Sequence, residues 1–261
     1  MPAPENIARR SDVVAVIPAR YGSTRFPGKP LVDLDGVPMI VRVARQAALT
    51  GARVVVATDD ARIEAAVRSA GFEAVQTPPD CASGTDRVAA AVTLLGLGGA
   101  RLILNVQGDE PLIDPEDLLA TVDECLGQGA PMGTLARPLE PARFESPTAV
   151  KVVRAQGGRA LYFSRAPIPW GCEKPLLHVG IYVYTPECLL RLSRLPPSTL
   201  ELTERLEQLR ALEDGIPIHV ALARSTAESI AIDVPEDVSC VVAALRDRAS
   251  QPSQRTTHAT R

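Results

Sequence analysis

Secretory and membrane-spanning segments are missing from this sequence. The first residues, MPAPENIARRSD, contain no apolar stretch like that of a signal peptide. No later apolar run reaches the roughly 20 residues that a bilayer-spanning helix requires. We therefore expect a protein that is neither secreted nor bound to a membrane and that works in the cytoplasm.

The cysteines show neither the pairing nor the spacing of a metal site or a disulfide framework. Five occur, an odd number, and they are spread from Cys81 to Cys240 without a C-x-x-C pair. We expect them to be reduced thiols, as is usual in a cytoplasm.

An excess of positive charge is also missing. The 28 lysines and arginines are outnumbered by 31 aspartates and glutamates, which gives a net charge of -3. A surface that coats nucleic acid would be broadly basic, so no nucleic-acid partner is expected. Any cluster of cations should therefore act locally.

What is present is the composition of an ordinary globular protein. The 261 residues are 46% hydrophobic and 23% charged, which allows a sizeable core. No internal repeat or linker divides the chain, so we expect residues 1–248 to form a single domain. The polar segment 249–261 is expected to be a disordered tail.

Short apolar runs alternate with segments of helical periodicity in the first half of the chain. The predicted strands and helices cover residues 13–17, 37–49, 54–57, Asp59 or Asp60 to Ser69, 73–76, 85–95 and 101–106. This alternation is typical of a Rossmann-like α/β fold with a doubly wound, mainly parallel sheet.

The rhythm changes from Met132 onwards. Predicted strands over 133–139, 149–155 and 159–164 follow one another, and two glycines at 157 and 158 predict a hairpin between the last two. These strands indicate a smaller antiparallel β lobe over about residues 132–185. A helix over 200–213, a strand over 218–223 and a helix over 235–248 complete the predicted fold.

A buried strand from Val13 to Ile17 runs directly into a loop with three cations, ARYGSTRFPGK. This loop would lie at the carboxyl end of the strand, where open α/β sheets bind ligands. Arg20, Arg25 and Lys29 would repel one another unless an anion binds between them. We predict a phosphate site, and a solvated basic loop is the alternative.

Small and hydroxylated residues in the same loop suit a phosphate ligand. Gly22 and Gly28 would let the backbone approach it, and Ser23 and Thr24 would supply hydroxyl groups. The spacing matches neither the P-loop, G-x-x-x-x-G-K-[ST], nor the dinucleotide motif, G-x-G-x-x-G. Neither of those two families is therefore supported.

Two aspartates are candidate metal ligands. Asp109 follows the fourth predicted strand in QGDEP, where a carboxylate can hold Mg²⁺ beside a nucleotide. Asp233 lies in IDVPED, and by itself it is better interpreted as the N-cap of the helix predicted from Pro235. Glu110 and Asp237 are neighbouring acids that could be confused with these two.

The loop IPARYGSTRFPGKPL resembles the signature of the sugar-activating cytidylyltransferases, most closely that of the 3-deoxy-manno-octulosonate (Kdo) cytidylyltransferases, or CMP-Kdo synthetases. Further segments match in the family's order: ATDD, SGTDR, NVQGDEP, LYFSRAPIPW, HVGIYVY, LEQLRALEDG and IDVPED. The matches extend from Val13 to Leu245, and together they are far more specific than any one of them.

The resemblance implies a nucleotidyltransferase fold and activity. CMP would pass from CTP to a small acidic acceptor, with release of pyrophosphate. The acceptor implied by the most similar family is Kdo. Mg²⁺ is the implied cofactor, held by Asp109 and Asp233, and Arg20 and Lys29 are the other implied catalytic residues. The resemblance also implies a homodimer formed through the antiparallel lobe.

Binding residues for both substrates follow from the same resemblance. SGTDR would begin a helix whose free amides face the nucleotide, and Cys81 stands where relatives commonly carry histidine. The implied nucleotide-binding residues are Pro18, Ala19, Arg20, Ser23, Thr24, Arg25, Lys29, Ser83, Gly84, Thr85, Arg87 and Gln107. The implied acceptor-binding residues are Gln107, Arg165, His178, Tyr182, Glu207 and Gln208. Taken singly, most of this second set would be interpreted as core or solvated residues.

Alternatives to this function stay open at this point. The segment between Arg165 and His178 is shorter than in many Kdo enzymes, so a phosphonate is an alternative acceptor. A glycosyltransferase of the same fold should carry a D-x-D metal motif, and none occurs near Asp109. A binding module without catalysis is the third alternative, and the presence of all four implied catalytic residues counts against it.

Overall fold

The computed structural model describes residues 12–22, 25–226 and 229–250, and the strands in this part of the chain form one sheet. The strands are β1 (Val13–Ala19), β2 (Arg53–Thr58), β3 (Glu73–Gln76), β4 (Leu102–Asn105), β5 (Met132–Pro138), β6 (Lys151–Arg154), β7 (Ala160–Ser164), β8 (Leu176–Tyr184) and β9 (Ile218–Leu222). The α-helices are α2 (Met39–Ala48), α3 (Ala61–Ser69), α4 (Gly84–Leu94), α5 (Pro115–Gln128), α6 (Pro186–Leu192), α7 (Thr199–Glu204), α8 (Gln208–Glu213) and α9 (Asp237–Ser250). None of these helices combines the length and hydrophobicity needed to cross a bilayer.

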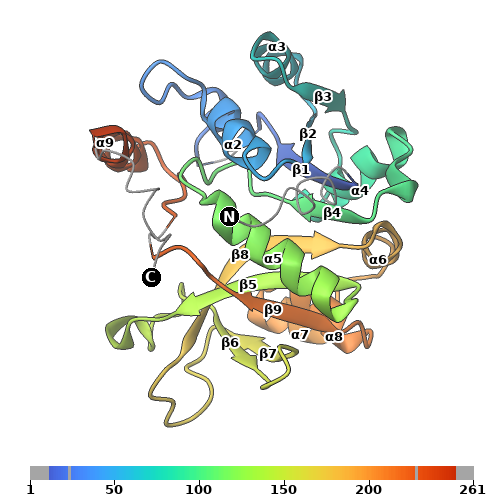
Figure 1. Cartoon of the computed structure of the whole chain (residues 1–261), viewed down its shortest axis with the longest axis vertical. Helices are drawn as coiled ribbons and strands as arrows, with labels where there is room; N and C mark the ends of the chain where they lie inside the picture. Colours follow the sequence, from blue (N-terminus) through green and yellow to red (C-terminus); the bar gives the residue numbers. More distant parts are fainter. Residues whose placement is uncertain (1–11, 23–24, 227–228, 251–261) are drawn as a thin grey trace, which may run out of the picture.

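The first four strands run parallel, as the sequence predicts. β1 pairs with β2 on one side and with β4 on the other, and β2 pairs with β3. Six of the seven residues of β1 are buried, because helices cover both faces of the sheet. α2, α3 and α5 pack on one face, and α4, α6 and α8 pack on the other (Figure 1). The doubly wound, mainly parallel α/β fold is confirmed.

The second half of the chain extends the same sheet. β8 is antiparallel to both β4 and β5, and β5 is parallel to β9. Of the lobe predicted over 132–185, only β6 and β7 leave the main path of the sheet, and they lie at the end of the molecule opposite α3 (Figure 1). The lobe is smaller than predicted because the nine residues of β8 reach from β6, at Leu177, to β4, at Tyr184.

The helix predicted over 200–213 is in fact two helices. α7 ends at Glu204, Arg205 adopts the left-handed conformation (φ 55°, ψ 48°), and α8 begins at Gln208. Leu206 and Leu209 are both buried. The apolar periodicity therefore continues across the break, and for this reason it does not reveal it.

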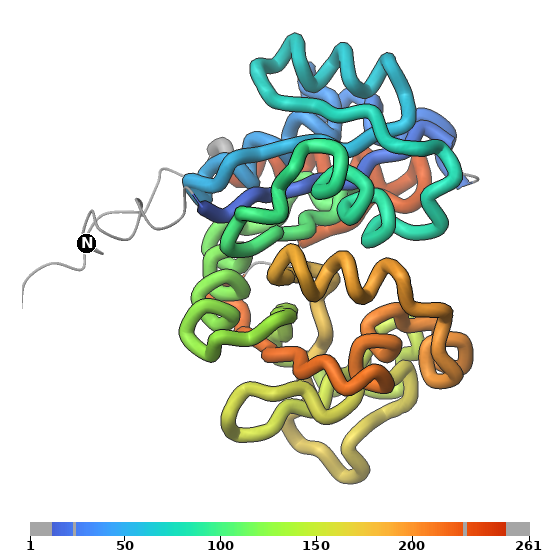
Figure 2. The backbone as a smooth tube through the Cα atoms, turned by 90° about the vertical axis from the view of Figure 1, so that its right-hand side faces the viewer, coloured from blue at the N-terminus to red at the C-terminus, as the bar shows by residue number. Residues whose placement is uncertain are grey.

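The last helix returns the chain to the first half of the molecule (Figures 1 and 2). It begins at Asp237, later than the predicted Pro235, and its backbone continues to Ser250. A small core joins it to the segments around α2; its buried members are Leu34, Met39, Leu112, Ile232 and Val241. This core fixes the segment that precedes α9. The rest of the predicted tail, 251–261, lies outside the described residues.

A buried ion pair connects α5 to β5 and to the chain that leaves β9. Asp117 on α5 is 2% exposed and accepts a hydrogen bond from Arg137 on β5 at 2.9 Å. Its other oxygen accepts hydrogen bonds from the backbone amides of Arg224 and Ser225, at 2.8 and 2.9 Å. One carboxylate thus holds the chain where it turns from β9 toward Asp233.

Replacing Asp117 by alanine should lower the free energy of unfolding by about 3 to 5 kcal/mol, because removing one partner of a buried pair leaves the other charge uncompensated. Asp123 on the same helix forms a more exposed ion pair with Arg224, at 2.8 Å. Its alanine variant should lose less than about 1 kcal/mol. Urea-induced unfolding measures both losses, and equal values would contradict the role given to Asp117.

Candidate active site

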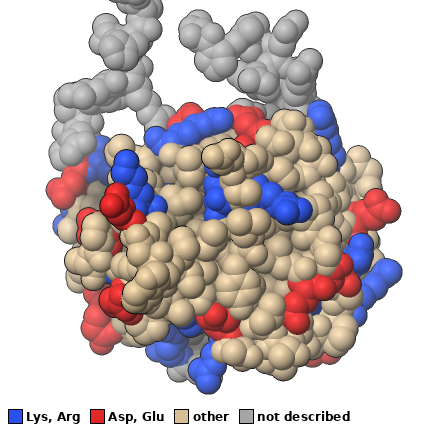
Figure 3. Space-filling model, turned by 90° about the horizontal axis from the view of Figure 1, so that it is seen from below, with Lys and Arg blue, Asp and Glu red and all other residues tan. Residues whose placement is uncertain are grey.

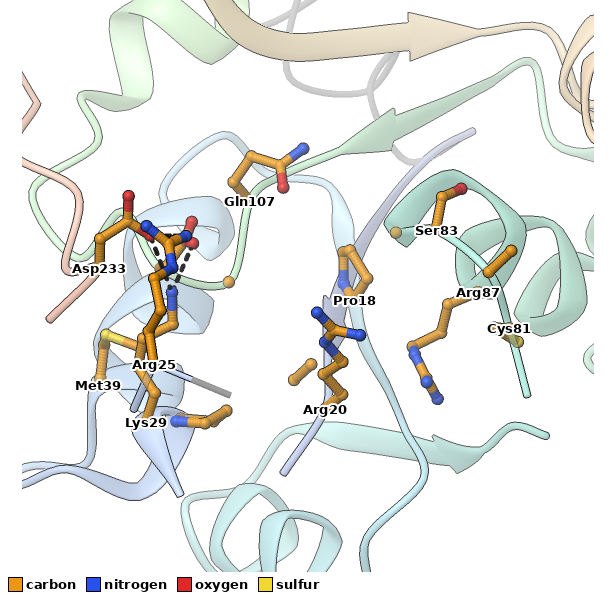
Figure 4. A pocket seen from close by; sticks show the side chains of 16 residues that line it. Pro18, Arg20, Arg25, Lys29, Met39, Cys81, Ser83, Arg87, Gln107 and Asp233 are labelled. Atoms are coloured by element: carbon orange, nitrogen blue, oxygen red, sulfur yellow. Dashed lines mark hydrogen bonds and ion pairs between the residues drawn. The ribbon is translucent and has the colours of Figure 1, made fainter. Parts of the chain in front are cut away.

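The carboxyl ends of β1 and β4 open into a cavity of about 260 Å³. Figure 4 shows side chains from distant parts of the chain pointing into it. The residues that line it are Pro18, Ala19, Arg20, Arg25, Lys29, Pro30, Met39, Cys81, Ala82, Ser83, Gly84, Arg87, Gln107, Gly108, Asp109 and Asp233. Most of the predicted nucleotide-binding residues are thus brought together at one edge of the sheet.

The three cations of the N-terminal loop do not share one environment. Arg20 follows β1 and lines the cavity, and it has no hydrogen-bond or ion-pair partner within the described parts of the chain. Arg25 and Lys29 are instead paired with carboxylates. Arg20 is therefore the cation of this loop whose charge still needs an anion to balance it, as the sequence predicts for all three. Ser23 and Thr24 lie outside the described residues.

Lys29 joins the two candidate metal ligands. Its ammonium nitrogen lies 2.8 Å from Oδ2 of Asp109 and 3.7 Å from Oδ1 of Asp233. It also donates a hydrogen bond to the carbonyl oxygen of Ile232 at 2.8 Å, and Arg25 lies 3.1 Å from the same Oδ1 of Asp233. The two aspartates, far apart in the sequence, therefore converge on one point.

Asp233 can face this cluster because a different residue caps the backbone ahead of α9. The Asp237 carboxylate accepts hydrogen bonds from the amides of Val234, at 3.0 Å, and Asp233, at 2.7 Å. These bonds hold the pKa of Asp237 below its usual value. The interpretation of Asp233 as the N-cap is therefore wrong. Glu110, the other acid next to this cluster, has a pKa that burial raises to about 7, with the charge of Asp109 adding to the effect.

The N-terminus of α4 forms another wall of the cavity. The Ser83 hydroxyl accepts a hydrogen bond from the Asp86 amide, and the Asp86 carboxylate accepts one from the Ser83 amide, both at 3.1 Å. This capping box fixes where the helix begins, and it places Ser83 and Gly84 on the cavity wall. Cys81 lies beside them, and burial raises the pKa of its thiol.

Two predicted nucleotide-binding residues on α4 have other contacts. Arg87 lines the cavity, but its buried guanidinium donates to Asp59 at 2.9 Å and to Thr77 at 2.6 Å. Its charge is therefore already paired. Thr85 lies on the wall of a second cavity, which Glu207 also lines. Among the predicted nucleotide-binding residues of α4, Ser83, Gly84 and Arg87 thus line the first cavity and Thr85 lines only the second.

The close approach of the β1 and β4 ends depends on a glycine. A Cβ atom on Gly108 would lie 2.6 Å from the carbonyl oxygen of Pro18, which is closer than a side chain permits. Gln107, immediately before it, lies on the walls of both cavities and donates to the Gly180 carbonyl at 3.3 Å. The two cavities are therefore adjacent and share Gln107.

The second cavity, of about 290 Å³, brings together five of the six predicted acceptor-binding residues. These are Gln107, His178, Tyr182, Glu207 and Gln208. The Tyr182 hydroxyl donates to Gln208 at 3.2 Å, and the Ser83 hydroxyl donates to Glu207 at 3.4 Å. The second contact links the wall of the first cavity to that of the second.

None of these five side chains is a cation. Burial lowers the pKa of His178 to about 3, and the ring nitrogen Nε2 lies 2.9 Å from the Thr134 hydroxyl. Burial also raises the pKa of Tyr182 far above its usual value and raises that of Glu207. His178 and Tyr182 are therefore both neutral at pH 7.

Arg165, the sixth predicted acceptor-binding residue, lines neither cavity. Its guanidinium donates to the carbonyl oxygens of Glu204 at 2.8 Å, Pro147 at 2.9 Å and Arg205 at 3.4 Å. The break after α7 leaves two of these carbonyls without partners inside a helix, and Arg165 satisfies them. Arg205 itself lines the second cavity, and sequence reasoning missed it because the break is invisible in the apolar pattern.

The buried neutral state of His178 should make the protein less stable in acid. Below pH 6.5 the unfolded chain protonates this histidine, whereas the folded chain does so only near the lowered pKa of about 3. Stability from this source is complete above pH 6.5 and should fall by about 1.4 kcal/mol for each pH unit below it. Urea unfolding at pH 6.5, 5.5 and 4.5 should show a shallower decline for the His178→Asn variant. Parallel declines would contradict the assignment.

Comparisons with known proteins agree with this geometry. The family model described as cytidylyltransferase matches residues 14–222. A 3-deoxy-manno-octulosonate cytidylyltransferase of Syntrophobacter fumaroxidans is 50% identical over 244 residues, covering 89% of this chain and 96% of the relative. One of Anaeromyxobacter dehalogenans is 52% identical over 233 residues, covering 87% and 94%. A solved structure described as CMP:2-keto-3-deoxy-manno-octonic acid synthetase complexed with CTP is 40% identical, with a TM-score of 0.85, and the match covers 90% of this chain and 99% of that one. The chain therefore belongs to the cytidylyltransferase family, among the 3-deoxy-manno-octulosonate cytidylyltransferases.

Proposed function

We propose that this protein transfers CMP from CTP to Kdo and releases pyrophosphate. The observation that carries the proposal is the convergence of Lys29, Asp109 and Asp233 in a cavity that shares Gln107 with a second one. A nucleotide in the first cavity would lie next to an acceptor in the second. The relatives reported above are named for Kdo and not for a phosphonate, which favours Kdo as the acceptor.

In the proposed reaction a hydroxyl oxygen of Kdo, on its anomeric carbon, bonds to the α-phosphorus of CTP. The bond from that phosphorus to the oxygen that bridges to the β-phosphate breaks, and the hydroxyl proton passes to solvent. Such a transfer depends on positioning and charge stabilisation more than on covalent help from the protein. Arg20, which has no partner in the described structure, and Lys29 would stabilise the triphosphate and the departing pyrophosphate.

The start of α4 would receive the nucleoside end of CTP. Ser83 and Gly84 line the first cavity together with Pro18 and Ala19, at the amino end of a capped helix. Free amides at such an end favour polar and anionic groups. We therefore expect the cytosine and ribose of CTP to bind at the start of α4 and its phosphates to bind toward Lys29.

Asp109 and Asp233 fit Mg²⁺ as the cofactor. Their oxygens are hard donors from segments that meet at Lys29, and Mg²⁺ usually takes one or two carboxylates and completes its shell with phosphate oxygens and water. Within the described residues no group of three or more His, Cys, Asp or Glu could hold a metal, so phosphate oxygens would complete the shell. When bound, the ion would neutralise phosphate charge and make the acceptor hydroxyl more acidic.

A homodimer is also part of the proposal, formed through the β6–β7 end. Trp170, in the loop that follows β7, is 98% exposed, and Leu161 on β7 is 51% exposed. Uncharged residues cover much of this end of the molecule (Figure 3). Contiguous apolar surface marks interaction sites, and we propose that Trp170 and Leu161 belong to one such surface. The five free cysteines fit the cytoplasmic location that the sequence predicts.

Pyrophosphate release tests the proposed function directly. The protein is incubated with Mg²⁺, CTP and one acceptor from a panel of Kdo, other sugar acids and phosphonates. We expect release with Kdo only when CTP and Mg²⁺ are both present. Release with a phosphonate and none with Kdo would overturn the proposed acceptor, and CTP binding without turnover of any acceptor would overturn the activity.

In the Lys29→Ala variant, turnover at saturating CTP and Mg²⁺ should fall by a factor of about 10² to 10³, as is typical when one electrostatic stabiliser is removed. Lys174→Ala removes an exposed lysine that lines neither cavity, and it should retain its turnover. Thermal unfolding of each variant shows whether it is folded at the assay temperature. Full turnover of a folded Lys29→Ala enzyme would contradict the role of Lys29.

Trp170→Glu should convert the proposed dimer into monomers, because a charge would have to be desolvated in the interface. Static light scattering gives the mass of each species. The chain contains a single tryptophan, so its emission should also shift to the blue as the wild-type dimer forms on concentration. Leu94→Glu changes a 57% exposed apolar residue on α4 and serves as the control. A monomeric wild type would refute the interface.

A further inference from the structure

The second cavity contains a cation that the predicted acceptor site does not include. Arg205 lines this cavity, and among the lining residues it is the one with a permanently charged cationic side chain. His178 is neutral, and Glu207 is an acid. An acceptor with a carboxylate would therefore meet Glu207 without compensation unless Arg205 takes part.

The guanidinium of Arg205 is available for a ligand. It is exposed, and it has no hydrogen bond or ion pair to any residue that the structure describes. Arg165, by contrast, donates from Nε and from both terminal nitrogens of its guanidinium to backbone carbonyl oxygens. Moving Arg165 into the cavity would leave those carbonyls unpaired, which would cost stability.

The backbone holds Arg205 at this position against its own preference. Its φ of 55° is in the left-handed region, where glycine is the usual residue at the end of a helix. The Arg205 amide donates to the Glu201 carbonyl, and the Arg205 carbonyl accepts from Arg165 at 3.4 Å. A side chain kept in an unfavourable backbone conformation next to a ligand cavity points to a role in that cavity.

We propose that Arg205 binds the carboxylate of the acceptor and determines the preference for an acidic substrate, while Arg165 is a positioning residue that fixes the Arg205 backbone. This inference rests on the proposed function. A guanidinium presents donors in a planar fork that matches the two oxygens of a carboxylate. The sugar hydroxyls would remain for Tyr182, Glu207 and Gln208 on the same cavity wall.

The test compares the wild type with Arg205→Gln, Arg205→Lys and Arg205→Gly, using pyrophosphate release with Kdo and with the methyl ester of Kdo. In Arg205→Gln, the KM for Kdo should rise tenfold or more while the KM for CTP changes less than about twofold. Arg205→Lys should recover part of the loss. The wild-type preference for Kdo over its ester should shrink to about twofold or less in Arg205→Gln.

Arg205→Gly separates binding from stability. Glycine suits the left-handed conformation, so this variant should unfold at the same temperature as the wild type or higher, yet show the same rise in the KM for Kdo. Arg194→Gln, an exposed arginine that lines neither cavity, should match the wild type in all of these measurements.

Two outcomes would overturn the proposal, and they differ in what else they affect. If the wild type releases pyrophosphate with Kdo and Arg205→Gln keeps both its KM and its preference for the free acid, only the role of Arg205 fails. If the wild type releases none with Kdo, the proposed function fails and takes the role of Arg205 with it.

Discussion

The contact of Lys29 with Asp109 and Asp233 is the interaction on which the site depends. Two carboxylates held near one another in a partly buried cavity repel, and Lys29 and Arg25 offset that repulsion. The Lys29 side chain is only 14% exposed, so solvent screens its pair with Asp109 less than it would screen a surface pair. Every element that fixes one of these four charges therefore contributes to the shape of the site.

Three separate parts of the fold supply that cluster. Lys29 is positioned by β1 and the turn at Gly28, and Asp109 by the end of β4, which lies close to β1 at Gly108. The small core beneath α9 holds the segment that contains Asp233. The parallel pairing of β1 with β4 aligns the first two at one edge of the sheet. β8, antiparallel to β4, then places the second cavity beside the first. Sheet topology thus sets the distance between the two proposed substrates.

Much of this arrangement could be predicted from the sequence, because its cause is local. Continuous apolar runs identify β1 and β4, and the strand that the sequence predicts over 73–76 has the bounds of β3. The Ser83 turn is a capping box formed by Ser83 and Asp86, so four neighbouring residues are enough to predict that a helix begins there. The convergence of Asp109 with Asp233 follows from no local pattern, and only the ordered resemblance of the motifs indicated it.

The errors have a common physical origin, which is that a side chain's partners lie far away in sequence. Arg25 and Lys29 look unpaired in the sequence because their partners, Asp109 and Asp233, lie far along the chain. Arg165 looks available for a ligand because the sequence does not show that the helix ends after α7 and exposes two carbonyl oxygens beside it. The break also moves Arg205 to the cavity. A motif can therefore identify the kind of charge that a site needs while the fold decides which residue supplies it. In this chain the Arg165 side chain binds the backbone that positions Arg205 at the cavity, so the two positions are coupled and their roles cannot be exchanged.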